Sequence, residues 1–448
     1  MFTLKLDDQW AIWVASLAAP LHARLAWRLP VVVLGILLAT GRRTATRWWH
    51  AAGVAKGFRS YYYFLDSIGR KTQPVAAALL KIAIEKIPVT DRLVFALDDT
   101  PTKRYGPKVQ GAGFHHNPTP GPAGSKFLYG HSWVTLSRVA HHARHGVIGL
   151  PLLAALYVRK LGIPALPPEA GIIFQTKLQI AAGMATWLSD QLPEPELKRA
   201  WLAVDGGYAK RNFLKPAIKA KLTVVARLRK DAALLDLPVP LKPGQKRGPG
   251  RPPIYGKNRL SLAKRAGQTR GWSQVKAVTT AGRSVTRTCK TFLATWRPAG
   301  GVVRVVILKE ADGKWRAFLC SDADASVEAI VQTILDRWAI EQNYHDLKEV
   351  ERVGEVQLRR VWANVGAMNL GLWVHTLVEV WAWARSASSL SDRGDRPWDD
   401  ADRRPSHADH RRALQRELVA EEYNRLDVPA PWTEKIRDLL AGVVRLVA

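Results

Sequence analysis

The sequence predicts an α/β fold in which helices flank a mixed sheet, with an N-terminal helical domain before it and a β-rich insertion within it. From residue 92, short continuous apolar runs alternate with amphipathic segments, as strands and helices packed in layers do. Further strand-like runs, including VTRTCKTFLATW and VVRVVIL, follow a stretch rich in Pro and Gly. These patterns divide the chain into an N-terminal helical domain (1–91), a first part of the core (92–236), a β-rich insertion (237–325), a second part of the core (326–385), a disordered linker (386–411) and a C-terminal helical region (412–448).

Residues 41–71 of the helical domain read as a helix, a short turn that contains glycine, and a second helix. Basic side chains surround the turn, among them Arg42, Arg43 and Arg47. A helix-turn-helix that grips DNA has this pattern. A helical hairpin whose Trp48 and Trp49 are core residues has the same pattern, so both interpretations stay open.

Two aspartates stand where predicted strands end. Asp99 follows the run RLVFAL, and Asp205 follows AWLAV. A carboxylate in this position is held rigidly at the edge where open α/β sheets bind ligands. Asp also ends strands as an ordinary turn residue, so neither position alone indicates a site. The core elements expected around them are strands at 92–97, 126–140, 146–158, 200–204 and 222–228, and helices at 176–192, 209–220 and 362–384.

The charge balance predicts a polyanionic partner. The chain has 67 Lys+Arg against 38 Asp+Glu, a formal net charge of +29. Residues 237–309 contain 16 Lys+Arg and no Asp or Glu, which favours contact with DNA over a solvated loop. The basic residues we expect to bind DNA here are Lys246, Arg247, Arg251, Lys257 and Arg259.

An amphipathic helix is predicted from about Ser326, and its polar side carries Arg337, Glu341 and Lys348 at spacings of four and seven residues. Two strand-end aspartates and one helical glutamate can together hold two Mg²⁺ ions, and such a pair promotes phosphodiester transfer. Arg337 and Lys348 would then meet the DNA backbone. The alternative is a plain surface ion pair between Arg337 and Glu341, worth about 0.3–0.5 kcal/mol.

Three segments in order match a known pattern. RWAIEQNYHDLK (337–348) matches the R-x3-E-x6-K part of Y-x2-R-x3-E-x6-K, although Ile334 stands at the tyrosine position. LDDTP and LAVDGGYAK match the two aspartate segments. In these motifs the sequence resembles the DDE transposases of bacterial insertion sequences over roughly 92–384. The resemblance implies an RNase H-like core whose catalytic residues and metal ligands are Asp99, Asp205 and Glu341, with Asp99 chosen over Asp98.

The same resemblance implies a cut-and-paste transposase that cleaves at transposon ends and transfers the strand into target DNA. Two Mg²⁺ ions would be its cofactors, with Mn²⁺ as a substitute. Its partners would be double-stranded DNA, both terminal inverted repeats and target, bound by a dimer. Two alternatives stay open: a catalytically inactive DNA-binding protein derived from a transposase, and a non-transposing RNase H-like nuclease.

The expected compartment is the bacterial cytoplasm, with nucleoid association when the protein acts. Two cysteines without a CxxC motif argue against a disulfide framework and a structural zinc site. The apolar run PVVVLGILLATG (30–41) is too short to span a bilayer, so no membrane partner is expected. Residues 1–10 lack the basic start of a signal peptide.

Overall fold

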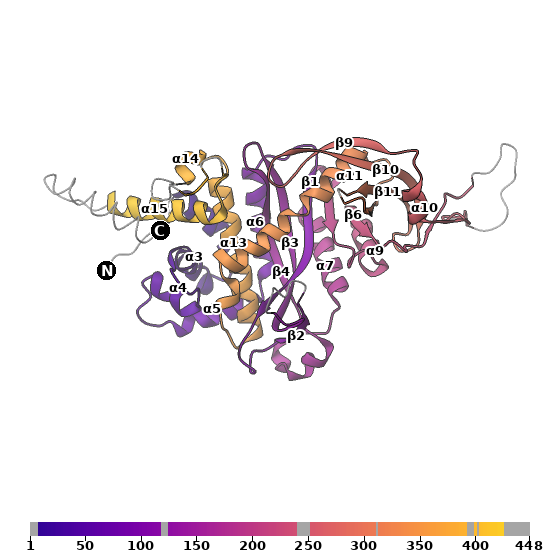
Figure 1. Ribbon diagram of the computed structural model, residues 1–448. Helices are drawn as coiled ribbons and strands as arrows, with labels where there is room; N and C mark the ends of the chain where they lie inside the picture. Colours follow the sequence, from indigo (N-terminus) through magenta and orange to yellow (C-terminus); the bar gives the residue numbers. More distant parts are fainter. Residues whose placement is uncertain are drawn as a thin grey trace.

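A continuous twelve-stranded sheet forms the centre of the protein in the computed structural model (Figure 1). The structure describes residues 8–117, 124–239, 251–310, 312–391, 398–400 and 403–424. Within these ranges the strand order is β2-β3-β1-β5-β6-β12-β11-β10-β7-β8, with β4 paired to β3 and β9 paired to β10. The strands are β1 (Leu93–Lys103), β2 (Gly113–His116), β3 (Phe127–His142), β4 (Gly146–Tyr157), β5 (Ala200–Val204), β6 (Thr223–Leu228), β7 (Leu234–Leu235), β8 (Arg259–Leu260), β9 (Ser273–Val278), β10 (Ser284–Trp296), β11 (Gly301–Lys309) and β12 (Trp315–Cys320).

The core of the sheet has the order β4-β3-β1-β5-β6. β3 runs antiparallel to both β1 and β4, whereas β1, β5 and β6 are parallel. Counted along the chain, this is the order three-two-one-four-five with the second strand antiparallel, the arrangement of an RNase H-like core. The strands read as continuous apolar runs because both of their faces are buried. The predicted fold class is confirmed.

Helices cover the sheet on two sides. One hydrophobic cluster joins alternate residues of the sheet to α6, α7, α9 and α13, and a second joins the intervening residues to α11 and α12. The helices of the core are α7 (Lys177–Gln191), α8 (Glu194–Lys198), α9 (Arg211–Lys219), α11 (Val327–Asp336), α12 (Ala339–His345) and α13 (Val361–Ala382). Short 3₁₀ turns lie at Lys160–Ala165, Pro168–Ala170 and Val353–Glu355, and a π-helical turn at Asp346–Val350. None of the helices in the described ranges is long and apolar enough to cross a membrane.

The described residues before the sheet form helices. Its helices are α1 (Asp8–Ala18), α2 (Ala23–Ala26), α3 (Arg28–Leu38), α4 (Ala45–Ala51), α5 (Arg59–Gly69) and α6 (Thr72–Lys86). α4 and α5 form the expected helix–turn–helix, and Trp48 and Trp49 are buried. α5 lies on α13, where a Cβ added to Gly366 would come within 2.2 Å of the carbonyl oxygen of Leu65. The hairpin therefore packs on the core rather than standing apart from it (Figure 1).

The basic β-rich segment extends the central sheet. β12 pairs with β6, with Ala317 opposite Leu228, and β11 and β10 continue outward from β12. Pairing satisfies the hydrogen-bonding groups that β6 would otherwise expose at an edge. The helix α10 (Leu262–Gly267) lies in the same segment, which forms the right side of Figure 1.

The prediction of a disordered linker at 386–411 is wrong for much of that segment. Ala387–Leu390 form the short helix α14, and α15 (His407–Asn424) begins inside the predicted linker. His407 and Arg411 are buried there, because they bind acidic side chains of the core. The predicted C-terminal helical region lies within the described residues only up to Asn424.

Candidate active site

The alternation of side chains along β1 separates the two adjacent aspartates. Val94 and Ala96 belong to the cluster on the α11 and α12 side of the sheet, and Leu97 belongs to the opposite cluster. Because successive side chains of a strand point to opposite faces, Asp98 faces α11 and α12 whereas Asp99 faces the α7 side.

Asp205 lies beside Asp98. The parallel register of β1 and β5 places Leu97 opposite Val204, so the next residue of each chain, Asp98 and Asp205, follows at the same level. Neighbouring strands are about 4.8 Å apart, and neighbouring residues of a parallel pair share a face. Burial raises the pKa of Asp98 to about 7, partly offset by the Asp99 backbone N–H and by Arg337, and the Asp205 carboxylate adds to the increase. The Asp205 carboxylate is therefore close enough to disfavour ionisation of Asp98.

Asp99 has other partners. Its Oδ2 accepts a hydrogen bond from Lys177 Nζ at 2.5 Å, and its Oδ1 accepts one from the Tyr208 hydroxyl at 3.0 Å. Lys177 is the first residue of α7, on the opposite side of the sheet from Glu341. Asp99 also lines a cavity of about 290 Å³ with His115 and Arg159. The structure thus places Asp99, which we expected as the first ligand, outside the group formed by Asp98, Asp205 and Arg337.

Glu341 reaches the same region from α12. Ser326 caps α11 by accepting a hydrogen bond from the Ala329 N–H, so the helix begins where the sequence predicts. The predicted single helix is divided: α11 ends at Asp336, and α12 begins at Ala339. Glu341 is therefore in the first turn of α12, where its side chain is 45% exposed.

Arg337 joins the helix acid to the strand acid. Its NH1 is 3.1 Å from Asp98 Oδ2, and its NH2 is 3.2 Å from Glu341 Oε1. The ion pair that was the plain alternative for Arg337 and Glu341 is present, but the same guanidinium also binds a carboxylate 239 residues away in sequence. One side chain thus holds Asp98 and Glu341 within the span of a guanidinium.

Lys348 follows in the π-helical turn, and its ammonium lies 5.9 Å from the ring centroid of Tyr344. Burial lowers the pKa of Lys348. The Tyr344 hydroxyl is 2.7 Å from Thr135 Oγ1, which in turn donates to the backbone carbonyl of Asp98 at 3.3 Å. Tyr344 and Thr135 thereby support the middle of β1, where Asp98 lies. Sequence reasoning missed both, although Tyr344 stands three residues after Glu341 and so on the same side of the helix.

The donor set fits hard divalent cations. Asp98, Asp205 and Glu341 offer carboxylate oxygens, the ligands that Mg²⁺ prefers, and the Glu341 side chain is 45% exposed, which leaves room for waters and phosphate oxygens. The ligand atoms of these three acids are not all within 4.8 Å of one another. In the described ranges, the group of potential metal ligands that is this close together is His375, Glu379 and His407. Asp98, Asp205 and Glu341 would not all have to contact one another in order to hold two ions, because each ion would take only some of them as ligands.

The other residues expected to bind DNA have different surroundings. Arg42 and Arg47 are exposed. Arg43 is partly buried, its backbone N–H donates to Glu355 Oε2 at 2.7 Å, and burial lowers its pKa to about 10. In the sheet extension Arg251, Lys257 and Arg259 are exposed, whereas Lys246 and Arg247 lie outside the described residues.

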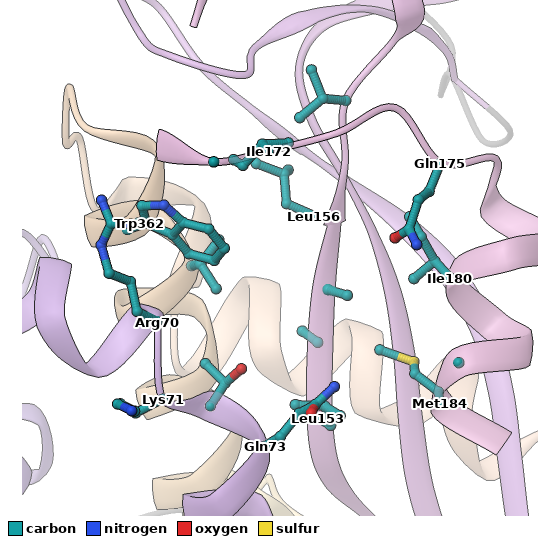
Figure 2. Close-up of a pocket in the computed structure, with 18 of the residues that line it drawn as sticks. Arg70, Lys71, Gln73, Leu153, Leu156, Ile172, Gln175, Ile180, Met184 and Trp362 are labelled. Carbon is teal, nitrogen blue, oxygen red and sulfur yellow. The ribbon is translucent and has the colours of Figure 1, made fainter. Parts of the chain in front are cut away.

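A larger cavity of about 560 Å³ lies between α6, β4, α7 and α13 (Figure 2). Leu153, Met184 and Trp362 are among its apolar lining residues, and Arg70 and Lys71 stand at one side. No acidic residue of the described ranges lines it, so these residues offer no carboxylate for a metal ion. Asp98 on β1, Asp205 directly after β5 and Glu341 on α12 are therefore the better candidates for phosphodiester chemistry.

Comparison with known proteins identifies the family. The sequence matches the family described as DDE superfamily endonuclease over residues 16–297, a range that includes Asp98 and Asp205 and ends before Glu341. The chain is similar to a piggyBac transposase in a synaptic complex with hairpin DNA, with 12% identity and a TM-score of 0.40 over 98% of this chain and 84% of that chain. It is also similar to the NurA nuclease of Sulfolobus solfataricus, with 10% identity and a TM-score of 0.23 over 63% of this chain and 86% of that chain. No curated protein matches the sequence. Because the family match spans more than half of its length, the chain belongs to the DDE superfamily of endonucleases.

Proposed function

We propose that the protein is a DNA transposase that cuts at transposon ends and joins the freed end to target DNA. Asp98, Asp205 and Glu341 would hold two Mg²⁺ ions, with Mn²⁺ able to replace them. The observation that carries the proposal is the Arg337 bridge between Asp98 and Glu341, together with the register that sets Asp205 beside Asp98. Asp98 replaces Asp99 as the first ligand, because Asp99 is paired with Lys177 on the other face.

The chemistry is a transfer between phosphodiesters. When bound, the ions would activate the attacking oxygen and stabilise the leaving one. Hydrolysis at the transposon end adds water across a P–O bond and frees a 3′-hydroxyl. That hydroxyl then attacks a second phosphodiester, which releases another 3′-oxygen, so the number of phosphodiester bonds is conserved in the transfer step.

Arg337 would change partners during this cycle. Without ions it balances the charge of Asp98 and Glu341. With Asp98 and Glu341 engaged as metal ligands, its guanidinium would be available to a DNA phosphate, which it could bind in bidentate fashion. Lys348, next to Tyr344 on the same helical segment, would bind a neighbouring phosphate.

Two exposed basic regions would bind the rest of the DNA. Arg42 and Arg47 flank the start of α4, and Arg251, Lys257 and Arg259 lie on the sheet extension. A dimer would bring two transposon ends together, and it would act in the cytoplasm at the nucleoid. The formal charge of +29 supports strong electrostatic attraction to DNA.

The proposal is tested by incubating the protein with Mg²⁺ and DNA that carries the terminal inverted repeats flanking its coding region. Wild-type protein should nick at the repeat ends, and Glu341→Gln should bind the DNA without cutting it. Glu328→Gln is the matched control, because Glu328 is exposed in the first turn of the neighbouring helix α11.

The outcomes separate the alternatives. Binding without cleavage by wild-type protein as well as Glu341→Gln would contradict the proposal and favour an inactive DNA-binding protein. Cleavage that ignores the repeats would favour an RNase H-like nuclease. Equal cleavage by wild type and Glu341→Gln would remove Glu341 from the mechanism.

A further inference from the structure

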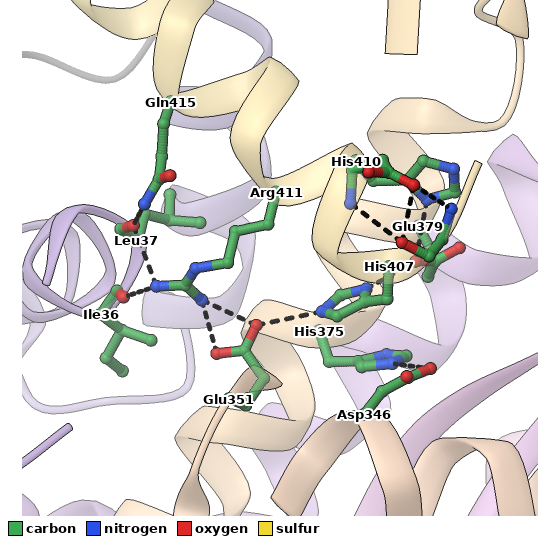
Figure 3. Close-up of polar contacts among 12 residues, drawn as sticks. Ile36, Leu37, Asp346, Glu351, His375, Glu379, His407, His410, Arg411 and Gln415 are labelled. Atoms are coloured by element: carbon green, nitrogen blue, oxygen red, sulfur yellow. Dashed lines mark hydrogen bonds and ion pairs between the residues drawn. The ribbon is translucent and has the colours of Figure 1, made fainter. Parts of the chain in front are cut away.

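A second cluster of potential metal ligands is buried between α13 and α15 (Figure 3). His375 and Glu379 are one turn apart on α13, and His407 is the first residue of α15. One ligand atom from each lies within 4.8 Å of the others. Their exposed fractions are 1%, 4% and 5%, so this is not a group of solvated surface side chains.

His375 is the residue that points to a ligand. Neither of its ring nitrogens has a hydrogen-bond partner within the described part of the protein, and its Nε2 is 3.9 Å from Asp346 Oδ2, too far for a hydrogen bond. Its ring stacks on that of His407 with 3.8 Å between centroids. An unpaired buried polar group is costly, and a metal ion would satisfy it.

His407 is oriented as a metal-binding histidine is. Its Nε2 lies 3.0 Å from Glu351 Oε1, and Arg411 clamps the same carboxylate with contacts of 2.7 and 2.6 Å. A carboxylate that holds one ring nitrogen of a ligating histidine fixes the ring and makes the other nitrogen a better donor. That other nitrogen, Nδ1, faces Glu379 Oε1 at 2.6 Å. The proton of this hydrogen bond lies between His407 Nδ1 and Glu379 Oε1, at the position where a cation would bind both groups.

His410 could be a fourth ligand, and a cavity beside the cluster has room for an ion. His410, three residues along α15, places its Nδ1 3.0 Å from Glu379 Oε1, and its Nε2 is buried without a hydrogen-bond partner. A cavity of about 220 Å³ adjoins the cluster and is lined by His375, Glu379, His407 and His410. A cavity of this size holds a metal ion and water.

We propose that His375, Glu379 and His407, completed by His410 or a water molecule, form a binding site for a divalent transition metal of the zinc class. Imidazole nitrogens with one carboxylate are ligands that zinc prefers, whereas Mg²⁺ prefers oxygen ligands throughout. The ion would replace the proton between His407 and Glu379. It would fasten α15 to α13 and, through Asp346, to the turn that directly follows α12, the helix of Glu341. The two cysteines, from which the absence of a structural zinc site was expected, are not part of this cluster.

The test measures metal content rather than activity. Full-length protein is loaded with Zn²⁺, dialysed against buffer containing Mg²⁺, and assayed for bound zinc by mass spectrometry. Wild-type protein should retain about one zinc per chain. His375→Phe keeps the ring stacking and removes a ligand, and Glu379→Gln keeps the shape and removes the charge; each should lower zinc affinity at least about tenfold.

Two controls distinguish this site from others. His345→Ala removes a histidine whose side chain is 64% exposed, and Glu341→Gln removes a proposed catalytic ligand; both should retain zinc. A titration of wild-type protein with Co²⁺ needs no variant and should produce the visible absorption of a tetrahedral nitrogen-ligated ion.

The proposal is overturned if wild-type protein retains no zinc, if His375→Phe and Glu379→Gln retain it as well as wild type does, or if Co²⁺ shows only the weak absorption of an octahedral ion. The result is independent of DNA cleavage, so failure here leaves the proposed function standing. Conversely, an inactive protein that binds zinc through these residues would support this proposal alone.

Discussion

The affinity of the candidate active site for Mg²⁺ should depend on pH because of Asp98. Burial raises the pKa of this carboxyl from 3.8 to about 7 in the metal-free protein. Only the ionised form binds Mg²⁺, so the apparent affinity scales with the ionised fraction, about 0.9 at pH 8 and about 0.1 at pH 6. We therefore expect apparent affinity to fall about tenfold from pH 8 to pH 6. A carboxyl with its ordinary pKa would give almost no change over this range.

Titration calorimetry with Mg²⁺ measures this effect directly. At pH 6, in two buffers of different ionisation enthalpy, binding should release close to one proton, and at pH 8 almost none. Asp98→Asn should lose both the tight binding and the proton release. Asp99→Asn should keep them, because Asp99 is paired with Lys177 on the opposite face. His115 does not add to the proton release between pH 6 and pH 8, because burial lowers its pKa to about 4. Affinity that is unchanged between pH 6 and 8, or proton release abolished by Asp99→Asn instead, would refute this reasoning.

Three further outcomes follow from the same structure. Without metal, Asp98→Asn should raise the melting temperature at pH 8 and have less effect at pH 5. The folded protein binds the Asp98 proton more tightly than the unfolded chain does, so the free energy of unfolding falls as the pH rises from 3.8 to about 7, and the asparagine avoids this loss. Gly366→Ala should destabilise the protein by about 1–3 kcal/mol in urea unfolding because its Cβ would meet the Leu65 carbonyl oxygen, whereas Gly183→Ala, on a helix with open space around it, should be neutral or stabilising. Replacing both Lys257 and Arg259 with Ala should reduce the slope of log affinity for DNA against log salt by about 2, and an unchanged slope would exclude them from the interface.

Much of the core could be predicted from sequence because its strands are buried on both faces. AWLAV, predicted as a strand at 200–204, is β5, and the helix at 176–192 is α7, shorter by a residue at either end. The positions of Asp205 and Glu341 relative to the sheet follow from elements that could be recognised locally.

The choice between Asp98 and Asp99 could not be made in the same way. Alternation along a strand indicates that adjacent residues face opposite sides, but not which side α12 covers. That depends on how α11 and α12 pack against Val94 and Ala96, a contact between segments far apart in the chain.

The predicted linker failed for a related reason. The segment 386–411 is rich in charged residues, a composition typical of disorder. His407 and Arg411 are nevertheless buried, because Glu351 and Glu379 neutralise them from the core. Composition alone does not reveal partners that lie elsewhere in the sequence.

The central claim is that Asp98, Asp205 and Glu341 hold two divalent ions. The most direct measurement is a crystal structure of the protein bound to DNA and Mn²⁺, with the ions located by their anomalous scattering. Two peaks about 3.5–4 Å apart, ligated by these three carboxylates with Asp98 between the ions, are the predicted result. Manganese bound beside Asp99, on the face of the sheet where Lys177 lies, would contradict the claim, and so would the absence of a peak near Glu341.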